Sequence, residues 1–216
     1  MTTLRLSYQT VEFGKIDIHL CTLRNNQEFH DPEGIAEKLG ISSASWPLFG
    51  VVWPSGLVLA HHMLDYDTSS KRILEVGCGM ALQHLMPNKK MADMTATDYH
   101  PEAQAFLERN TLLNHDRNIA FEMADWAAKS DKLGLFDLII GSDLLYEDEH
   151  IELLAEFIHN HANPSCEVIL VDPGRGRKNK LSTLMTAFGF TASQLKPDHT
   201  EYLSKAFKGH ILKFVR

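Results

Sequence analysis

The 216-residue chain contains only three cysteines, and they are scattered at Cys21, Cys78 and Cys166. No C-x-x-C pair occurs, so neither a disulfide framework nor a zinc ribbon is indicated. The chain also has no apolar run that approaches the length of a membrane-spanning helix. Its N-terminus lacks the charged and then apolar segments of a secretory signal. We therefore expect an intracellular, cytoplasmic protein without a membrane partner.

Positive charge is scarce as well, with 21 Lys and Arg against 28 Asp and Glu and a formal net charge of −7. That balance argues against a protein that coats nucleic acid. Hydrophobic residues at 44% are an ordinary globular value, and the length suits one domain. We expect this domain to be a monomer.

Several catalytic patterns are also missing. No G-x-S-x-G elbow of a hydrolase is present. The Asn/Asp-Pro-Pro-aromatic loop of methylases that act on base amino groups is absent too. The 12 histidines include the pairs His61-His62 and His159-x-His161, but neither pair has an acid or cysteine at ligand spacing. We expect no metal site.

Short apolar runs alternate with helical patterns along most of the chain, which predicts one α/β doubly wound domain with a mostly parallel, seven-stranded sheet. We assign residues 46–216 to this domain and residues 1–45 to an N-terminal extension packed on it. The predicted strands lie around 72–76, 94–98, 119–123, 136–146, 167–171, 190–195 and 210–215.

The extension alternates in places between Tyr8 and Leu23, which predicts a β-hairpin turned at Gly14-Lys15. A short polar helix is expected to start at residues 31–34. Further on, Pro54 is expected to open a helix with Leu57, Ala60, His61 and Leu64 on one face. Trp53, just before it, is either a core side chain or part of a ligand site.

The segment from Arg72 to Ala81 organises the chain. A buried parallel strand is followed by Gly77 and Gly79, which let the backbone turn sharply and approach a ligand. A dinucleotide fingerprint would need glycine at position 82, where the chain has Leu82. Glu75 inside the strand would repel a pyrophosphate but suits a cation such as the ammonium group of S-adenosylmethionine.

Asp98 ends the next predicted strand, nineteen positions after Gly79. At that distance a strand-end carboxylate accepts hydrogen bonds from both ribose hydroxyls of a nucleotide cofactor. The alternative is that Asp98 caps the following helix, which we expect to open at Pro101 with Ala103, Phe106, Leu107 and Asn110 on one stripe.

Leu74-Glu75-Val76-Gly77-Cys78-Gly79 resembles motif I of the class I, seven-strand S-adenosylmethionine-dependent methyltransferases. Ser142-Asp143-Leu144-Leu145-Tyr146 is similar to a marker of their protein-lysine methyltransferase branch: an acid, two apolar residues and a tyrosine after the fourth strand. Trp53-Pro54-Ser55-Gly56 is similar to the segment that precedes motif I in the same branch. Asp172-Pro173-Gly174-Arg175 resembles its electron-transfer-flavoprotein β-subunit lysine methyltransferases. The likeness covers residues 46–216.

The resemblance implies S-adenosylmethionine as cofactor, held by eight residues. Glu75, Gly77 and Gly79 would hold its amino-acid end and Asp98 its ribose. At the adenine, Asp125 would accept from the amino group and Trp126 would cover the ring. The remaining two are Trp53 and Ser142.

Asp143 and Tyr146 would line the channel of the acceptor amine and act as the catalytic residues. The acceptor is expected to be a protein lysine. The alternatives are a small, nicotinamide-like amine, or a cofactor-binding module without catalysis. The run Arg175, Arg177, Lys178 and Lys180 is either a solvated charge cluster or a site for an acidic peptide or phosphate. The segment 83–90 predicts an unusually interrupted helix.

Overall fold

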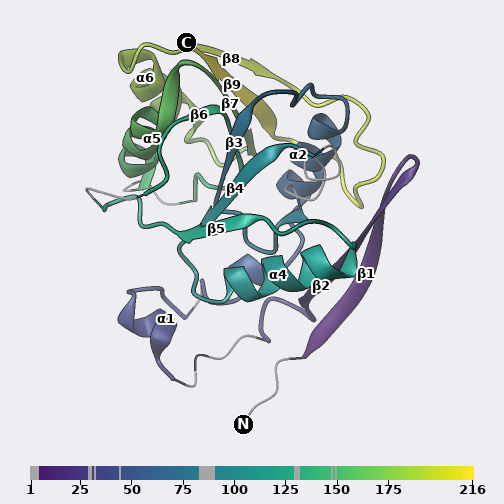
Figure 1. The fold of residues 1–216 in the computed structure, drawn as a ribbon. Helices are drawn as coiled ribbons and strands as arrows, with labels where there is room; N and C mark the ends of the chain where they lie inside the picture. Colours follow the sequence, from purple (N-terminus) through teal and green to yellow (C-terminus); the bar gives the residue numbers. More distant parts are fainter. Residues whose placement is uncertain are drawn as a thin grey trace.

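The computed structural model describes residues 5–28, 31, 33–43, 45–82, 91–128, 132–146, 148 and 150–216. A seven-stranded sheet forms its centre, with the strand order β5-β4-β3-β6-β7-β9-β8 (Figure 1). The first five strands in this order are parallel, whereas β9 is antiparallel to both of its neighbours. The strands are β3 (Arg72–Val76), β4 (Asp93–Asp98), β5 (Ala120–Met123), β6 (Phe136–Ser142), β7 (Ala162–Asp172), β8 (Thr191–Leu195) and β9 (His210–Val215).

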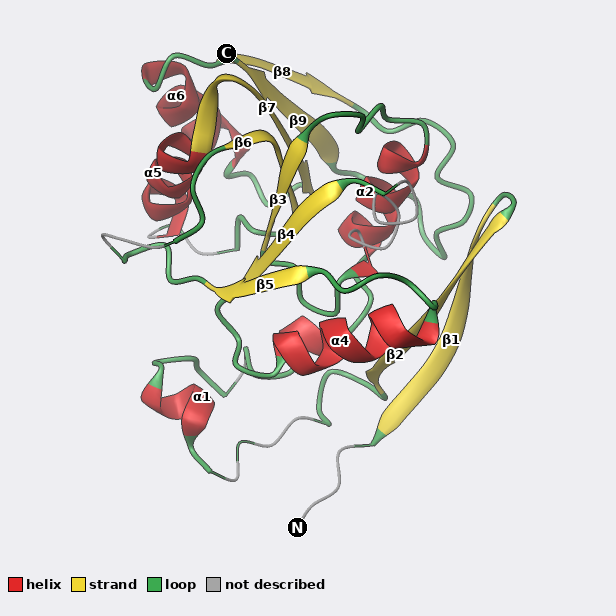
Figure 2. Cartoon of the chain, viewed as in Figure 1, coloured by secondary structure: helices red, strands yellow, loops and turns green. Residues whose placement is uncertain are grey.

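Helices cover both faces of this sheet (Figure 2). Leu74, Val76 and Ile139 point to one face, where they pack with α5 (His150–His161) and α6 (Lys178–Ala187). Ile73 and Ile140 point to the other face and pack with α2 (Pro54–Leu64). This alternation is typical of strands buried on both sides. The helix α4 (Ala103–Leu113) packs over Ala96 on the face that carries α2.

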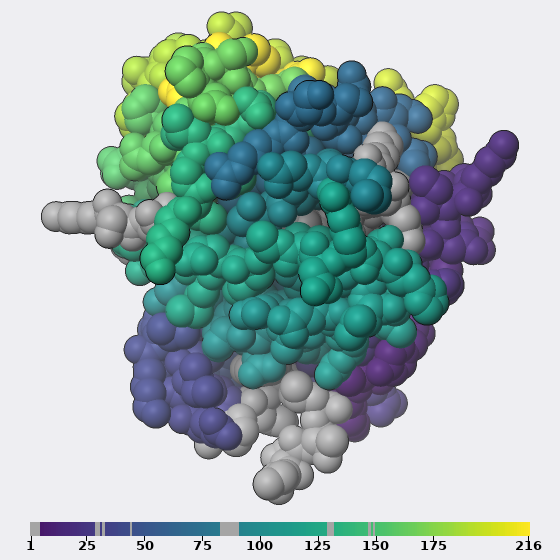
Figure 3. Space-filling view, viewed as in Figure 1, coloured from purple at the N-terminus to yellow at the C-terminus, as the bar shows by residue number. Residues whose placement is uncertain are grey.

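The extension forms a separate two-stranded sheet of β1 (Leu6–Phe13) and β2 (Ile16–Leu23), which are antiparallel. Its turn lies at residues 14 and 15, as predicted. The hairpin runs along one side of the molecule beside α4, seen in purple in Figure 3. A short helix α1 (Ile35–Lys38) follows, and both carboxylate oxygens of Asp31 accept hydrogen bonds from its first turn, from Ile35 N and Glu37 N. A 3-10 turn, η1 (Leu48–Gly50), precedes α2.

The predicted strands and helices that lie among the described residues are confirmed in type, but several of their bounds differ. Helix α4 begins at Ala103 rather than at Pro101, and strand β6 ends at Ser142. Strand β7 begins at Ala162, because the chain passes from α5 directly into it. The helix predicted across 83–90 lies outside the described residues.

The predicted inner face of α2 is incomplete. Leu57, His61 and Leu64 are only half-buried, whereas Val58, Leu59 and Met63 are almost fully buried. The reason is that α2 lies between the sheet and the hairpin, and Phe13 of β1 packs against the ring of His61 at 4.6 Å. A helix enclosed on several sides does not show a single apolar stripe.

Candidate functional site

The loop after β3 has an unusual backbone. Gly77 and Gly79 have φ angles of +65° and +53°, which L-residues rarely adopt. A Cβ added at Gly77 would lie 2.5 Å from Leu144 Cδ2, and one at Gly79 would lie 2.7 Å from the carbonyl oxygen of Phe49. Both glycines are therefore required by close packing as well as by conformation. The loop is enclosed by the segment before α2 and by the segment after β6.

Glu75 is fully buried in β3 and faces the side of the sheet that carries α2. Its neighbours in register are Ala96 of β4 and Ile140 of β6. A buried carboxylate is costly unless cations or hydrogen-bond donors compensate it. A buried carboxyl group two residues before the glycine loop makes Glu75 a candidate for contact with a ligand.

Asp98 ends β4 beside the glycine loop. Its Oδ2 accepts a hydrogen bond from Gly79 N at 2.8 Å, and its Oδ1 accepts one from His100 N at 2.8 Å. Burial raises the pKa of this carboxyl, and the backbone hydrogen bonds oppose the increase. A carboxylate has about four acceptor positions, so the two bonds leave capacity for ribose hydroxyls. The geometry fits the predicted role, and no cap of α4 by Asp98 is observed.

The segment before α2 packs against this loop. Trp53 is half-buried, and its Nε1–H donates to the carbonyl oxygen of Leu48 at 2.8 Å, which closes the segment on itself. Phe49 stacks on the ring of His100, with 3.9 Å between the ring centroids. Burial lowers the pKa of His100 to about 4. The stack with Phe49 connects the Trp-Pro segment to the residues that follow Asp98.

The loop after β6 reaches the same edge of the sheet. Ser142, half-buried, is the last residue of β6, and Asp143 has φ +58°, with its N–H donating to Val171 O at 2.9 Å. Since a residue with a Cβ avoids positive φ, this conformation is strained. In this conformation the chain turns at Asp143, so that the side chain of Leu144 packs over Gly77.

The carboxylate of Asp143 is held by Arg175. Both Nε, at 3.0 Å, and Nη2 of the guanidinium donate to the same oxygen, Oδ1. Burial raises the pKa of Asp143, Arg175 opposes that increase, and the nearby carboxylate of Asp172 adds to it. Sequence reasoning placed Asp143 here but missed its partner, which lies 32 residues away.

The two predicted adenine residues lie after β5. Asp125 is exposed, and its Oδ1 accepts a hydrogen bond from Ala127 N at 2.8 Å. Trp126 is half-buried against the core. Its ring meets the ring of His150 edge to face at 6.2 Å, and His150 meets the ring of Tyr146 in the same way at 6.1 Å. His150, which sequence reasoning missed, thus connects the predicted adenine and acceptor residues.

The basic run after β7 is engaged within the protein. Besides the pair between Arg175 and Asp143, Arg177 bonds to Asp148, and Lys180 lies 3.1 Å from Glu152. Lys178 Nζ lies 3.3 Å from the ring nitrogens of His210. These pairs favour the solvated charge cluster over a site for an acidic ligand.

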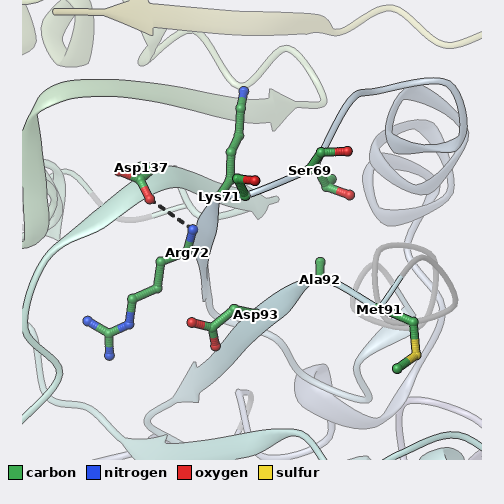
Figure 4. A pocket seen from close by; sticks show the side chains of 9 residues that line it. Ser69, Lys71, Arg72, Met91, Ala92, Asp93 and Asp137 are labelled. Carbon is green, nitrogen blue, oxygen red and sulfur yellow. Dashed lines mark hydrogen bonds between the residues drawn. The ribbon is translucent and has the colours of Figure 1, made fainter.

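Two surface hollows of about 350 Å³ and 330 Å³ lie at the opposite edge of the sheet, at the amino ends of β3 and β4. Figure 4 shows the first, where Asp137 accepts a hydrogen bond from Arg72 N at 2.9 Å. In α/β sheets ligands bind at the carboxyl ends of the strands, so we assign neither hollow to the cofactor. Among the described residues no group of three His, Cys, Asp or Glu converges as metal ligands would. No helix in the described part of the chain is long and apolar enough to cross a bilayer.

Known proteins share sequence and fold with this chain. The profile of a family described as lysine methyltransferase matches residues 37–187. Protein N-lysine methyltransferase METTL21A of Danio rerio is 30% identical over 139 residues, which are 59% of this chain and 63% of that protein. The electron transfer flavoprotein beta subunit lysine methyltransferase of Danio rerio is 24% identical over 143 residues, 61% of this chain and 52% of that protein. The chain thus covers less than two thirds of either relative.

Among solved structures, a methyltransferase from Pyrococcus furiosus superposes with a TM-score of 0.60 at 22% identity. The superposition covers 76% of this chain and 83% of that one. This likeness concerns the fold, which is that of the Rossmann-like class I methyltransferases, and it confirms the predicted doubly wound sheet.

Proposed function

Because the chain belongs to the lysine methyltransferase family, we propose that it transfers a methyl group from S-adenosylmethionine to the side-chain amine of a lysine in a protein. The family and the fold imply this cofactor. When bound, it supplies an electrophilic methyl group on a sulfonium. The carboxyl groups and backbone N–H groups at the carboxyl edge of the sheet are suited to the charged and hydrogen-bonding groups of this cofactor.

In this proposal Glu75 receives the ammonium end of the cofactor, beside the backbone of Gly77 and Gly79. Asp98 accepts hydrogen bonds from the ribose hydroxyls while it keeps its bonds to the backbone. The adenine is placed by Asp125 and Trp126, and the pocket is completed by Trp53 and Ser142.

One observation carries the proposal: the segment with Asp143 and Tyr146 packs directly on the glycine loop. Leu144 Cδ2 lies only 2.5 Å from the position that a Cβ on Gly77 would take. The proposed acceptor residues and the proposed cofactor loop therefore share one edge of the sheet and one contact. Methyl transfer requires donor and acceptor to be held within a few ångström of each other.

The acceptor must be neutral, because a protonated amine has no lone pair to attack the methyl carbon. A free lysine has a pKa of ~10.4, so the site has to favour loss of the proton. The proposed means are desolvation and orientation, by Asp143 and by the hydroxyl of the 39% exposed Tyr146. Arg175 already pairs with Asp143 Oδ1, so Asp143 orients the amine, through its other oxygen, rather than acting as a strong base.

The test is transfer of labelled methyl from S-adenosylmethionine into a cell lysate, followed by mass spectrometry of labelled proteins. We expect label on lysine side chains. Asp143→Asn and Tyr146→Phe should lower transfer at least about tenfold and keep binding of S-adenosylhomocysteine. Tyr202→Phe is the matched control, since Tyr202 is a similarly exposed tyrosine, at 38%, in the loop before β9.

Other outcomes would select other functions. Label confined to the small-molecule fraction would favour a small-amine methyltransferase, which can share the marker after β6. Retained cofactor binding with no transfer would favour a non-catalytic module. Label on arginine would overturn the lysine assignment.

We propose further that the chain acts as a monomer in the cytoplasm, with residues 46–216 as the methyltransferase domain and residues 1–45 as an extension. The three cysteines are buried free thiols, which supports a reducing compartment. The net charge of −7 argues against nucleic acid as the substrate. Cell fractionation and light scattering of the purified chain test these points.

A further inference from the structure

Asn110 connects the N-terminal hairpin to the glycine loop. This α4 residue is fully buried, and its Oδ1 accepts a hydrogen bond from Cys21 N at 2.7 Å. Its Nδ2 donates to Cys21 O at 3.2 Å and to Met80 O at 2.8 Å. One side chain thus binds β2 and the loop that follows β3.

The bond to Met80 fixes a particular peptide plane. The carbonyl of this peptide unit accepts from Asn110, and its other end, Ala81 N–H, donates to Cys78 O at 2.7 Å. Ala81 has φ +72°, a left-handed conformation that is unfavourable for a residue with a Cβ. Rotation of this plane would relax Ala81, and it would break both hydrogen bonds.

We propose that Asn110 is a positioning residue for the cofactor: it holds the strained turn at Met80 and Ala81 and so keeps the preceding Gly77–Gly79 backbone in its binding conformation. The turn follows Gly79 directly, and Gly79 N donates to Asp98, the proposed ribose carboxylate. A rotated plane would therefore disturb both ends of the cofactor site. This inference rests on the proposed cofactor site, and it does not depend on which amine is methylated.

Asn114 provides an internal control one helical turn later. Its Oδ1 accepts from His19 N at 2.8 Å, and its Nδ2 donates to His19 O at 2.7 Å. These bonds repeat those of Asn110 to Cys21, because four helix residues rise about 6 Å, close to the rise of about 6.6 Å of two strand residues. Asn114 Nδ2 also donates to Asn110 O at 2.7 Å. Of these two asparagines, Asn110 is the one that bonds to Met80.

The experiment compares Asn110→Ala with Asn114→Ala in the full chain. Calorimetry with S-adenosylhomocysteine measures affinity, thermal unfolding measures stability, and hydrogen exchange measures protection of the amides of Met80, Ala81 and Leu82. We expect both variants to lower the unfolding temperature. Only Asn110→Ala should weaken S-adenosylhomocysteine, by about tenfold, as for a buried carbonyl that loses its donor. Only this variant should speed exchange at Ala81.

A second pair keeps the test decisive if the alanine variant does not fold. Asn110→Asp retains the shape and the acceptor for Cys21 N but has no N–H for Met80, and Asn114→Asp is its control. Ala81→Gly added to Asn110→Ala should restore part of the affinity, because glycine tolerates φ +72° without a bond from Asn110.

Equal loss of affinity in the Asn110 and Asn114 variants would overturn the proposal, as would unchanged affinity in Asn110→Ala. Loss of methyl transfer with intact binding would instead concern the proposed function.

Discussion

His100 is buried, 5% exposed, two residues after the carboxylate proposed to bind ribose. Its Nδ1 accepts a hydrogen bond from Glu102 N at 3.2 Å, which requires that nitrogen to be unprotonated. Stacking on Phe49 removes water from the ring. Burial lowers its pKa to about 4, and the nearby carboxylate of Asp31 opposes this change only in part.

The lowered pKa predicts loss of stability in acid. Between pH 6.5 and about 4 the unfolded chain binds a proton at residue 100 that the folded chain does not, so the free energy of unfolding falls as pH falls. Between pH 6.5 and 4.5 this difference amounts to about 2–3 kcal/mol. Urea unfolding of His100→Gln should show a shallower dependence over this interval than the parent chain. The control is His115→Gln at an exposed imidazole; equal slopes for parent and His100→Gln would contradict the prediction.

For single residues, the sequence could predict which positions belong to the candidate site but not which residues they contact. Glu75, Gly79 and Asp98 are recognisable because a strand, its glycines and the next strand end have characteristic spacing. The pairing of Asp143 with Arg175 and the stacking of Phe49 on His100 join segments whose approach depends on the assembled fold. No local pattern encodes such distances.

Among the helices, α2 departs most from its predicted face, and Ser55 shows why. The side chain is fully buried in the first turn, and its Oγ has no hydrogen-bond partner among the described residues. Enclosure between the sheet and the hairpin is a tertiary effect that helical periodicity does not report.

Ser55→Ala should therefore leave the free energy of unfolding unchanged or raise it by up to about 1 kcal/mol, because it removes an unsatisfied buried hydroxyl from a helix. Thr97→Val is the contrasting variant, since Thr97 Oγ1 donates to Glu75 O at 2.8 Å and its loss should cost about 1 kcal/mol. Urea unfolding checks both values. Weaker binding of S-adenosylhomocysteine by Ser55→Ala would show instead that the hydroxyl serves the cofactor.

For the whole molecule, the alternation of strands and helices predicts the doubly wound class. The alternating residues between Tyr8 and Leu23 predict the N-terminal hairpin. The position of the hairpin was not predictable, because it depends on side chains of α4 that bond the backbone of β2. Asn110 was predicted to lie on the inner stripe of its helix, and it does. Its contacts explain why a polar amide occupies that stripe: it satisfies backbone groups of two segments that are far apart in sequence.

Cofactor binding at this edge should stabilise the whole chain by mass action. S-adenosylhomocysteine at about 100 times its dissociation constant adds about 2.7 kcal/mol if it binds only the folded state. For a domain of this size that raises the unfolding temperature by about 5–10 °C. The double variant Glu75→Gln with Asp98→Asn should lose this shift, since it removes both charges that the cofactor is proposed to meet, whereas Asp198→Asn at an exposed acid should keep it. A full shift in the double variant, measured by scanning calorimetry, would place the cofactor elsewhere on the chain.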